Sequence, residues 1–271
     1  MNRLCLTLIV LLFLSCNKES EIPSNYNLNI NKPKFNSDIE FLCKNKNKIT
    51  VKCDSIDDGG EDWIKSRGIV WSESQMPTLV DNSASISNFQ INNGFVLNLI
   101  NLKQNNEYFI IGFAENDGGI AYTNQINVKT YSDNYVLPCS YNNSILFEEQ
   151  NGNLSNLEID MVLLFDFVEY DEIRGSGVNN DTIFFIEFKE GFDAKSDIYL
   201  TVDDAILSSK ISTDDCKVRY GIRGSNGLYD YYYCKPHQEI FVDINESWDF
   251  SVTFCNLQFS NGLVLSGSFN R

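Results

Sequence analysis

Two cysteines close a segment whose pattern predicts a disulfide-bonded hairpin. Cys216 and Cys234 flank the sequence KVRYGIRGSNGLYDYYY, which has a turn signal at residues 224–227. With the turn there, Ile222 faces Leu228, and the same register places Cys216 opposite Cys234. Opposed Cα atoms of antiparallel strands lie about 4.5–5.5 Å apart, within the range of a disulfide. The segment therefore predicts a Cys216–Cys234 bridge.

Four further cysteines follow two different expectations. Cys139 and Cys255 remain as a second bridge, for which nothing local fixes the distance. Cys43 and Cys53 follow the inward alternation of two strands beside a short turn, which leaves them about 17 Å apart in a tight hairpin. We therefore expect Cys43 and Cys53 to stay reduced and buried.

The chain contains histidine and carboxylate residues that could serve in hydrolysis or metal binding, but their spacing matches no known catalytic or metal-binding motif. His237 is the only histidine, and nothing around it resembles a nucleophile elbow or a zinc site. The acidic stretches DSIDDGGED (54–62) and EYDE (169–172) lack the spacing of an EF-hand, so they are interpreted as solvated turns, with Ca²⁺ binding as the alternative. A glycosidase-like pair of carboxylates depends on a distance that the sequence does not give. We expect no cofactor and no metal.

Three tyrosines of the same hairpin form a candidate ligand-binding surface. Tyr229, Tyr231 and Tyr233 share one face, because side chains alternate along a strand. Each offers a flat ring and a hydroxyl group, which suits contact with sugars or polar peptides. The alternative, that a second sheet covers these rings as part of a core, is the stronger of the two interpretations.

The first residues have the pattern of an export signal. Residues 4–14 are apolar and uncharged, too short to cross a bilayer as a helix, and Ser15 precedes Cys16. The pattern resembles a bacterial lipoprotein signal, with Cys16 as the lipidated residue; an ordinary secretory signal is the alternative. Residues 17–21 resemble the export tag of Bacteroidetes surface lipoproteins. This implies an outer-membrane lipoprotein attached to the bilayer through its lipid and exposed on the cell surface, or else retained on the periplasmic face.

The charge of the chain argues against two classes of partner. Its 21 Lys and Arg residues against 37 Asp and Glu residues give a net charge of −16. Residues 1–15 hold one of these bases and no acid, so their removal leaves 20 against 37, or −17. Such a chain repels phosphate backbones and anionic lipid surfaces, so we expect no nucleic acid partner.

The distribution of apolar residues predicts an all-β protein with two β-sandwich domains in tandem. Alternation such as Phe184, Ile186 and Phe188 recurs in both halves, and turn signals recur about every ten residues. Only residues 203–211 could form a helical turn or two. We divide the chain into a signal peptide (1–15), a tether (16–33), a first domain (34–132) and a second domain (135–271).

The first domain resembles fibronectin type III-like domains of Bacteroidetes surface lipoproteins. The resemblance rests on GGEDWIKSRGIVWSES and on LNLINLKQNNEYFIIGFAENDGGIAYTNQINVKT, and it implies an immunoglobulin-like sandwich. Leu102 and Tyr108 have the spacing of a tyrosine corner, in which the Tyr hydroxyl bonds to the backbone of the crossing connection. The second domain more weakly resembles the sandwich that ends such lipoproteins, which implies no defined activity.

Two tripeptides match the O-glycosylation pattern of Bacteroidetes, with Ser55 and Thr182 as acceptors. Together these features favour a surface-exposed, non-catalytic binding or adhesion lipoprotein whose ligand is a glycan, a matrix protein or an envelope protein. A structural spacer or subunit of an envelope complex is the second hypothesis. A hydrolase that uses paired carboxylates is the third. The oligomeric state does not follow from the sequence.

Overall fold

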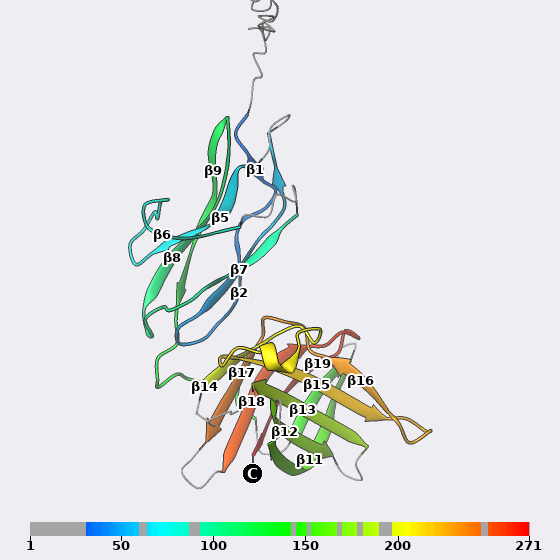
Figure 1. Ribbon diagram of the computed structural model, residues 1–271. Coiled ribbons are helices and arrows are strands. Elements are labelled where there is room, and N and C mark those ends of the chain that lie inside the picture. Colours follow the sequence, from blue (N-terminus) through cyan, green and yellow to red (C-terminus); the bar gives the residue numbers. More distant parts are fainter. Residues whose placement is uncertain are drawn as a thin grey trace, which may run out of the picture.

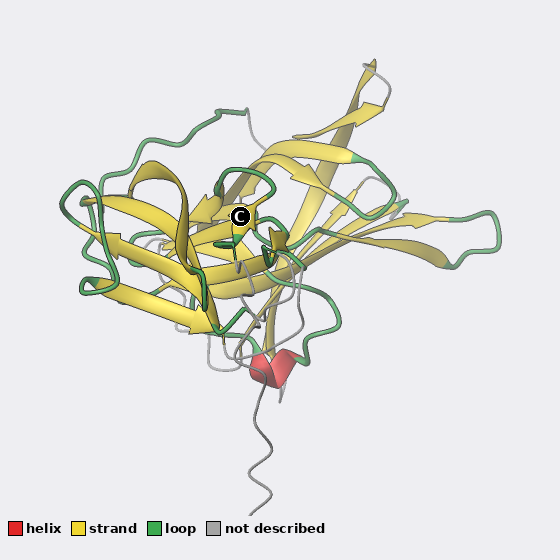
Figure 2. Cartoon of the chain, turned by 90° about the horizontal axis from the view of Figure 1, so that it is seen from above, coloured by secondary structure: helices red, strands yellow, loops and turns green. Residues whose placement is uncertain are grey.

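The computed structural model describes residues 31–59, 64–86, 93–141, 145–150, 153–166, 170–177, 181–189, 197–244 and 249–270. Nearly all regular structure in these ranges is strand, as Figures 1 and 2 show, with one 3-10 turn at Ser208–Lys210 inside the segment expected to be helical. No helix within the described ranges has the length and apolar character needed to cross a membrane. The predicted lipidation site, Cys16, lies outside the described residues.

The N-terminal sandwich, the part of the chain that holds β1–β9, packs two sheets face to face (Figure 1). One sheet has the strand order β2-β3-β7 and the other has the order β6-β5-β8-β9, while β1 and β4 form a small separate pair. The strands are β1 (Lys34–Phe35), β2 (Glu40–Lys44), β3 (Ile49–Cys53), β4 (Ile56–Asp57), β5 (Ser66–Ser72), β6 (Asn82–Ile86), β7 (Phe95–Leu99), β8 (Glu107–Asn116) and β9 (Gly119–Lys129). Alternate residues such as Ile49, Ile69 and Ile110 form the shared core.

The predicted tyrosine corner is present. Tyr108 lies at the start of β8, and its hydroxyl oxygen accepts a hydrogen bond of 2.9 Å from the backbone N–H of Lys103. Tyr108 and Leu102 are both buried. The hydroxyl thus satisfies a backbone donor in the connection that crosses from one sheet to the other, which fixes the edge of the sandwich.

The C-terminal sandwich, the part that holds β10–β19, forms its two layers from one continuous sheet. The first half of β11 pairs with β10 and its second half pairs with β12, so this strand passes from one layer to the other. The strands are β10 (Ile145–Gln150), β11 (Asn153–Asp166), β12 (Tyr170–Gly177), β13 (Thr182–Lys189), β14 (Asp197–Thr201), β15 (Asp215–Arg223), β16 (Tyr229–Tyr233), β17 (Glu239–Ile244), β18 (Phe250–Gln258) and β19 (Val264–Asn270). Pairing of β13 with β15 joins the two ends of the sheet. Between the layers, the ring of Phe184 stacks on that of Phe254 with centroids 5.1 Å apart. The expected tandem of two β-sandwiches is therefore confirmed.

The predicted bridge between Cys216 and Cys234 is wrong, because the hairpin register differs by two residues. In the structure Ile222 faces Asp230, and the N–H of Cys234 bonds to the carbonyl oxygen of Val218. The two cysteines are thus diagonal neighbours on the buried face, and such pairs lie about 7–8 Å apart. That separation exceeds the usual Cα distance of a disulfide. Both thiols are free, and the amide of Gln238 donates to the sulfur of Cys234.

The second predicted bridge is present. Cys139 and Cys255 are disulfide-bonded with their Cα atoms 6.1 Å apart. This bond attaches the connecting segment, residues 130–141, to β18 on the outside of the C-terminal sandwich. The thiols of Cys43 and Cys53 are free and buried, which confirms the expectation for that pair.

Charged and hydrogen-bonded contacts join the two sandwiches. The ammonium group of Lys48, in the β2–β3 turn, lies 2.7 Å from the carboxylate of Asp215. The carboxylate of Glu239, at the start of β17, accepts hydrogen bonds from the Tyr131 hydroxyl (2.8 Å) and from the backbone N–H of Lys44 (3.0 Å). Burial raises the pKa of Glu239 above its ordinary value, against the opposing effect of the Tyr131 bond.

Candidate functional site

The three tyrosines predicted to contact a ligand lie on the outer face of β16. Tyr231 is 42% exposed and Tyr233 is 37% exposed, and Tyr229 is half-buried. The intervening Tyr232 points the other way and packs against the hydrophobic core. The structure therefore decides between the two interpretations of the tyrosine pattern in favour of the exposed surface.

Arginine side chains lie among these aromatic rings. The guanidinium carbon of Arg219 lies 4.5 Å from the ring centroid of Phe185 and 5.8 Å from that of Tyr231. Arg174 lies 4.8 Å from the same Phe185 ring. Ring centroids of Phe185 and Tyr231 are 6.0 Å apart, as are those of Tyr231 and Tyr229. These contacts form a continuous array across β12, β13, β15 and β16. We name it the aromatic–arginine face, which comprises Arg174, Phe185, Arg219, Tyr229 and Tyr231, together with Arg223 and Tyr233, which strand pairing places on the same side.

A buried carboxylate holds two of the arginines in place. Glu172 on β12 is fully buried, and its Oε1 accepts hydrogen bonds from Arg174 Nη2 (2.6 Å) and Nε (3.0 Å). Its Oε2 accepts a bond of 3.2 Å from Arg219 Nη2. Burial of a carboxylate requires such partners, and the bonds orient both guanidinium groups. The interpretation of EYDE as a solvated turn was wrong for Glu172, which lies on a strand and is buried. The spacing E-x-R puts Glu172 and Arg174 on one face of a strand, and this spacing could have indicated the ion pair.

A glycine lets one tyrosine ring lie close against the sheet. Gly221 is paired with Tyr231 across β15 and β16. A Cβ atom at position 221 would lie 3.0 Å from Tyr231 Cε1 and 2.9 Å from Ile183 Cγ2. Any larger residue would displace the ring, so Gly221 sets the height at which Tyr231 is presented.

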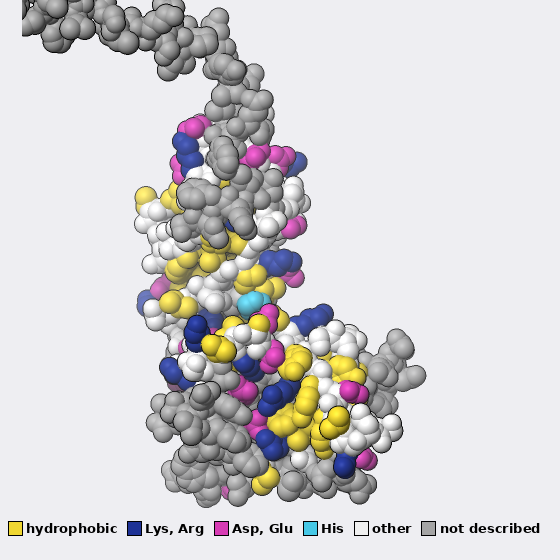
Figure 3. Space-filling model, turned by 45° about the vertical axis from the view of Figure 1, so that its right-hand side comes forward, with side chains coloured by type: hydrophobic (Ala, Val, Ile, Leu, Met, Phe, Trp, Pro, Cys, Tyr) yellow, Lys and Arg dark blue, Asp and Glu magenta, His cyan; other side chains and the backbone are white. Residues whose placement is uncertain are grey.

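The charge of this face is opposite in sign to that of the whole chain. Strand register places five bases on this side of the sheet, Arg174, Lys189, Lys217, Arg219 and Arg223, against three acids, Glu172, Glu187 and Asp215. Half of the chain's six arginines thus gather on one face of a protein with a net charge of −16. A space-filling view shows hydrophobic and basic side chains side by side over the C-terminal sandwich (Figure 3).

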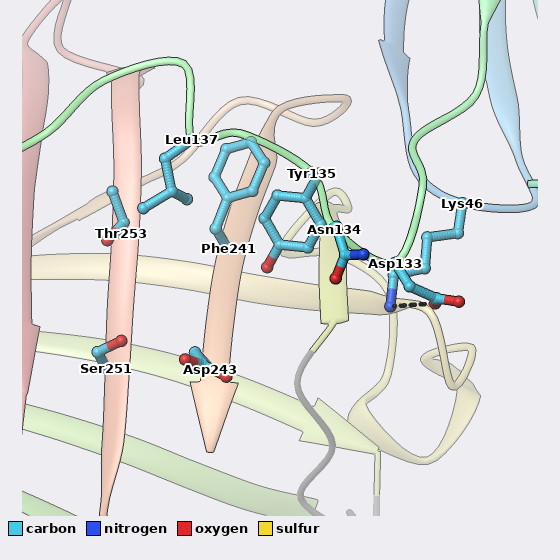
Figure 4. A pocket seen from close by; sticks show the side chains of 9 residues that line it. All are labelled: Lys46, Asp133, Asn134, Tyr135, Leu137, Phe241, Asp243, Ser251 and Thr253. Atoms are coloured by element: carbon cyan, nitrogen blue, oxygen red, sulfur yellow. Dashed lines mark ion pairs between the residues drawn. The ribbon is translucent and has the colours of Figure 1, made fainter. Parts of the chain in front are cut away.

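A second concave feature lies where the connecting segment crosses the C-terminal sandwich. It has a volume of 570 Å³, and Figure 4 shows side chains of the segment and of β17 and β18 around it. Rings of Tyr135 and Phe241 pack with centroids 5.5 Å apart and form its apolar wall. Burial and the nearby Asp243 carboxylate raise the pKa of Tyr135. Asp133 turns toward Lys46, which lies 3.5 Å away, rather than toward Asp243 (Figure 4). The two acids of this pocket therefore do not form the facing pair that a glycosidase needs.

The remaining predicted residues belong neither to the aromatic–arginine face nor to this pocket. Ser55 lies between β3 and β4, where its hydroxyl oxygen accepts a hydrogen bond from Asn36, while Thr182 at the start of β13 is buried. His237 is half-buried, with a φ of 65°, and its backbone N–H bonds to Thr201. Within the described ranges no group of three or more His, Cys, Asp or Glu side chains is placed to hold a metal ion.

Comparison with known proteins adds weak structural similarity. No protein-family model matches the chain, and no curated protein does. Among solved structures, the crystal structure of the FN1–FN3 domains of chicken CNTN1 is similar, with a TM-score of 0.30 and 15% identity over 84% of this chain and 76% of that one. At this level of similarity the match adds nothing to the assignment of the fold, which rests on the order and pairing of the strands.

Proposed function

We propose that the chain is a non-catalytic binding lipoprotein of the bacterial cell surface, attached through a lipid on Cys16, which contacts a glycan through Tyr229, Tyr231 and Tyr233. The observation that carries the proposal is the exposure of these rings beside the packed Tyr232. Flat aromatic rings that combine an apolar face with a hydroxyl group suit the apolar faces and polar edges of sugars. A rigid sheet holds them, so little conformational entropy is lost on binding.

Glycan-binding measurements on the chain without residues 1–15 test this function. Substitution Tyr231→Ala should weaken binding about tenfold, which corresponds to 1.4 kcal/mol. Tyr122→Ala is the matched control, because Tyr122 is similarly exposed at 45% but lies on β9 of the other sandwich. Equal affinity of the wild type and Tyr231→Ala, with both chains folded, would contradict the proposed surface.

Attachment to the membrane is tested separately. Substitution Cys16→Ser should move the protein from the membrane fraction to the aqueous fraction, since the lipid chains supply the membrane affinity. Protease added to intact cells should degrade the wild type if it is displayed on the surface. Full protection of the chain would instead place it on the periplasmic face.

The joint between the sandwiches favours the spacer hypothesis as a second candidate. A buried ion pair and a disulfide on the connecting segment both restrict rotation of one sandwich against the other. A rigid two-domain rod would hold the aromatic–arginine face at a fixed distance from the anchored end. Loss of ligand capture on cells after insertion of a flexible linker at residue 134, with unchanged affinity in solution, would support this role.

A further inference from the structure

We infer that the aromatic–arginine face binds an extended anionic polysaccharide, through carboxylate or sulfate groups that alternate with stacked sugar rings. This rests on the proposed function and specifies the class of its ligand. The first reason is charge, because an excess of two bases on one face of a chain of net charge −16 attracts an anion locally while the rest of the surface repels it.

The second reason is the chemistry of the bases. Three of the bases on this face are arginines. A guanidinium group donates paired hydrogen bonds to carboxylate and sulfate oxygens and also stacks on aromatic rings. The side chain of Arg219 remains 32% exposed beside the fully buried Glu172, so this ion pair leaves part of the arginine side chain open to a ligand. Arg223 is exposed at the end of β15, next to Tyr229 on the paired strand.

The third reason is spacing. Arg219 and Arg223 lie on the same face of β15, four residues or about 13 Å apart. Tyr233 and Tyr229 are paired with them, and Tyr231 is paired with the intervening Gly221. The face therefore alternates cation, ring and cation along one line. A single small anion would use one end only, whereas a chain with repeated acidic groups and sugar rings between them would use the whole line.

A matched set of polymers tests this inference on the chain without residues 1–15. Dextran, carboxymethyl-dextran and dextran sulfate share one backbone, so their affinities, measured by calorimetry at 50 mM and 200 mM salt, separate the effect of charge from that of the sugar. We expect one of the charged forms to bind at least tenfold more tightly than dextran, with an affinity that falls as the salt concentration rises. Comparison of the two charged forms shows whether carboxylate or sulfate is preferred.

Two substitutions assign the binding to this face. Arg223→Gln should weaken binding of the charged form about tenfold and leave dextran unaffected, since Arg223 is exposed and takes no part in the Glu172 network. Tyr231→Ala should weaken binding of charged and neutral forms alike. Lys52→Gln is the control, because it removes one exposed base from the N-terminal sandwich.

Other outcomes overturn the inference in distinguishable ways. Equal binding of dextran and its charged forms, still sensitive to Tyr231→Ala, would refute the anionic class and retain the proposed glycan function. Binding of no polymer and of no glycan would refute both. Equal or tighter binding of polyglutamate or single-stranded DNA, with the same dependence on Arg223 and Tyr231, would identify an acidic peptide or a nucleic acid as the ligand instead. Binding of every polyanion without dependence on Tyr231 would reduce the effect to non-specific ion exchange.

Discussion

Lys48 and Asp215 form an ion pair between the two sandwiches, with 2.7 Å between Nζ and Oδ1 and with each side chain only 11% exposed. Lys48 comes from the β2–β3 turn and Asp215 from the first residue of β15. Two charges removed from water in this way depend on each other, because either one alone would be buried without compensation. The pair therefore couples the two sandwiches in a way that surface ion pairs do not.

Substitution Lys48→Met should lower the free energy of unfolding by about 3 kcal/mol, since it leaves Asp215 buried and uncompensated. The double variant Lys48→Met/Asp215→Leu should recover most of that loss, because neither charge remains. Urea unfolding of the wild type, both single variants and the double variant gives the coupling energy. Additive losses in the double variant would show that the two residues do not depend on each other.

The hydroxyl group of the tyrosine corner gives a second prediction. Tyr108→Phe should lower the free energy of unfolding by about 1–2 kcal/mol, because the N–H of Lys103 loses its acceptor while the ring packing is retained. Tyr122→Phe, at an exposed position, is the control and should change nothing measurable. Equal stability of Tyr108→Phe and the wild type in urea unfolding would mean that water replaces the hydroxyl group at this backbone donor.

Local patterns in the sequence predicted local structure well. Alternation identified the strands, and the six-residue spacing of Leu102 and Tyr108 identified the corner, because each depends on neighbours along the chain. Alternation also placed Tyr229, Tyr231 and Tyr233 on one face, but whether another layer covered that face depended on the course of the whole sheet. The stronger expectation, that these rings belong to a core, was wrong.

Features that depend on distant strands were missed. Glu172 is buried because Arg219, 47 positions away, reaches it from β15. The hairpin register failed because its turn runs from Gly224 to Leu228, where the Gly224 N–H bonds to the Leu228 carbonyl oxygen. That turn is one residue longer than the four-residue signal at 224–227, and the predicted pairing of Ile222 with Leu228 was one residue short even for that signal. Together the two differences move the partner strand by two positions.

The acidity of Glu239 predicts how stability depends on pH. Burial raises its pKa in the folded chain above the value of 4.5 that it has when unfolded. The folded state therefore favours the protonated carboxyl, so this group contributes stability below pH 4.5 that is lost as the pH rises through the folded-state pKa. Glu239→Gln should remove this loss, so the stability of the variant relative to the wild type should increase between pH 4 and pH 8.

Urea unfolding at several pH values measures that difference. Glu107→Gln is the matched control for the loss of one negative charge, since Glu107 is exposed and its carboxylate accepts a bond from Asn127. A stability difference for Glu239→Gln that falls with rising pH would show that the hydrogen bonds from Tyr131 and Lys44 outweigh the cost of burial.

The Cys139–Cys255 disulfide should hold the connecting segment against the C-terminal sandwich. It closes a loop with a sequence separation of 116, and loss of such a bond costs about 2–5 kcal/mol. The double variant Cys139→Ala/Cys255→Ala should unfold at lower urea and should be cut by chymotrypsin after Tyr135, which the wild type resists. Identical digestion of both proteins would show that the packing of Tyr131 and Tyr135 on Phe241 is sufficient to hold the segment.

The remaining cysteines of the described chain should be unreactive in the folded protein. Burial raises the pKa of the Cys43, Cys53 and Cys234 thiols to about 12 and also raises that of Cys216. The reactive thiolate is therefore scarce at pH 8. Iodoacetamide should label none of the four in the folded chain without residues 1–15, and all four in urea without reductant, while Cys139 and Cys255 stay unlabelled.

The same thiols predict a loss of stability at alkaline pH. In the unfolded chain they ionise near their ordinary pKa of 9.0, whereas in the folded chain they stay protonated to about 12. Their contribution is thus fully present below pH 9 and is lost as the pH rises from 9 toward 12. Substitution Cys53→Ala removes one such group and should reduce the slope of unfolding free energy against pH in that window.

Peptide mapping without reductant tests whether Cys216 and Cys234 are free, as the structure has them. We expect no crosslinked peptide that joins them, because the hairpin register makes them diagonal neighbours. A crosslinked peptide would contradict the free thiols and would support the shorter turn in the β15–β16 hairpin.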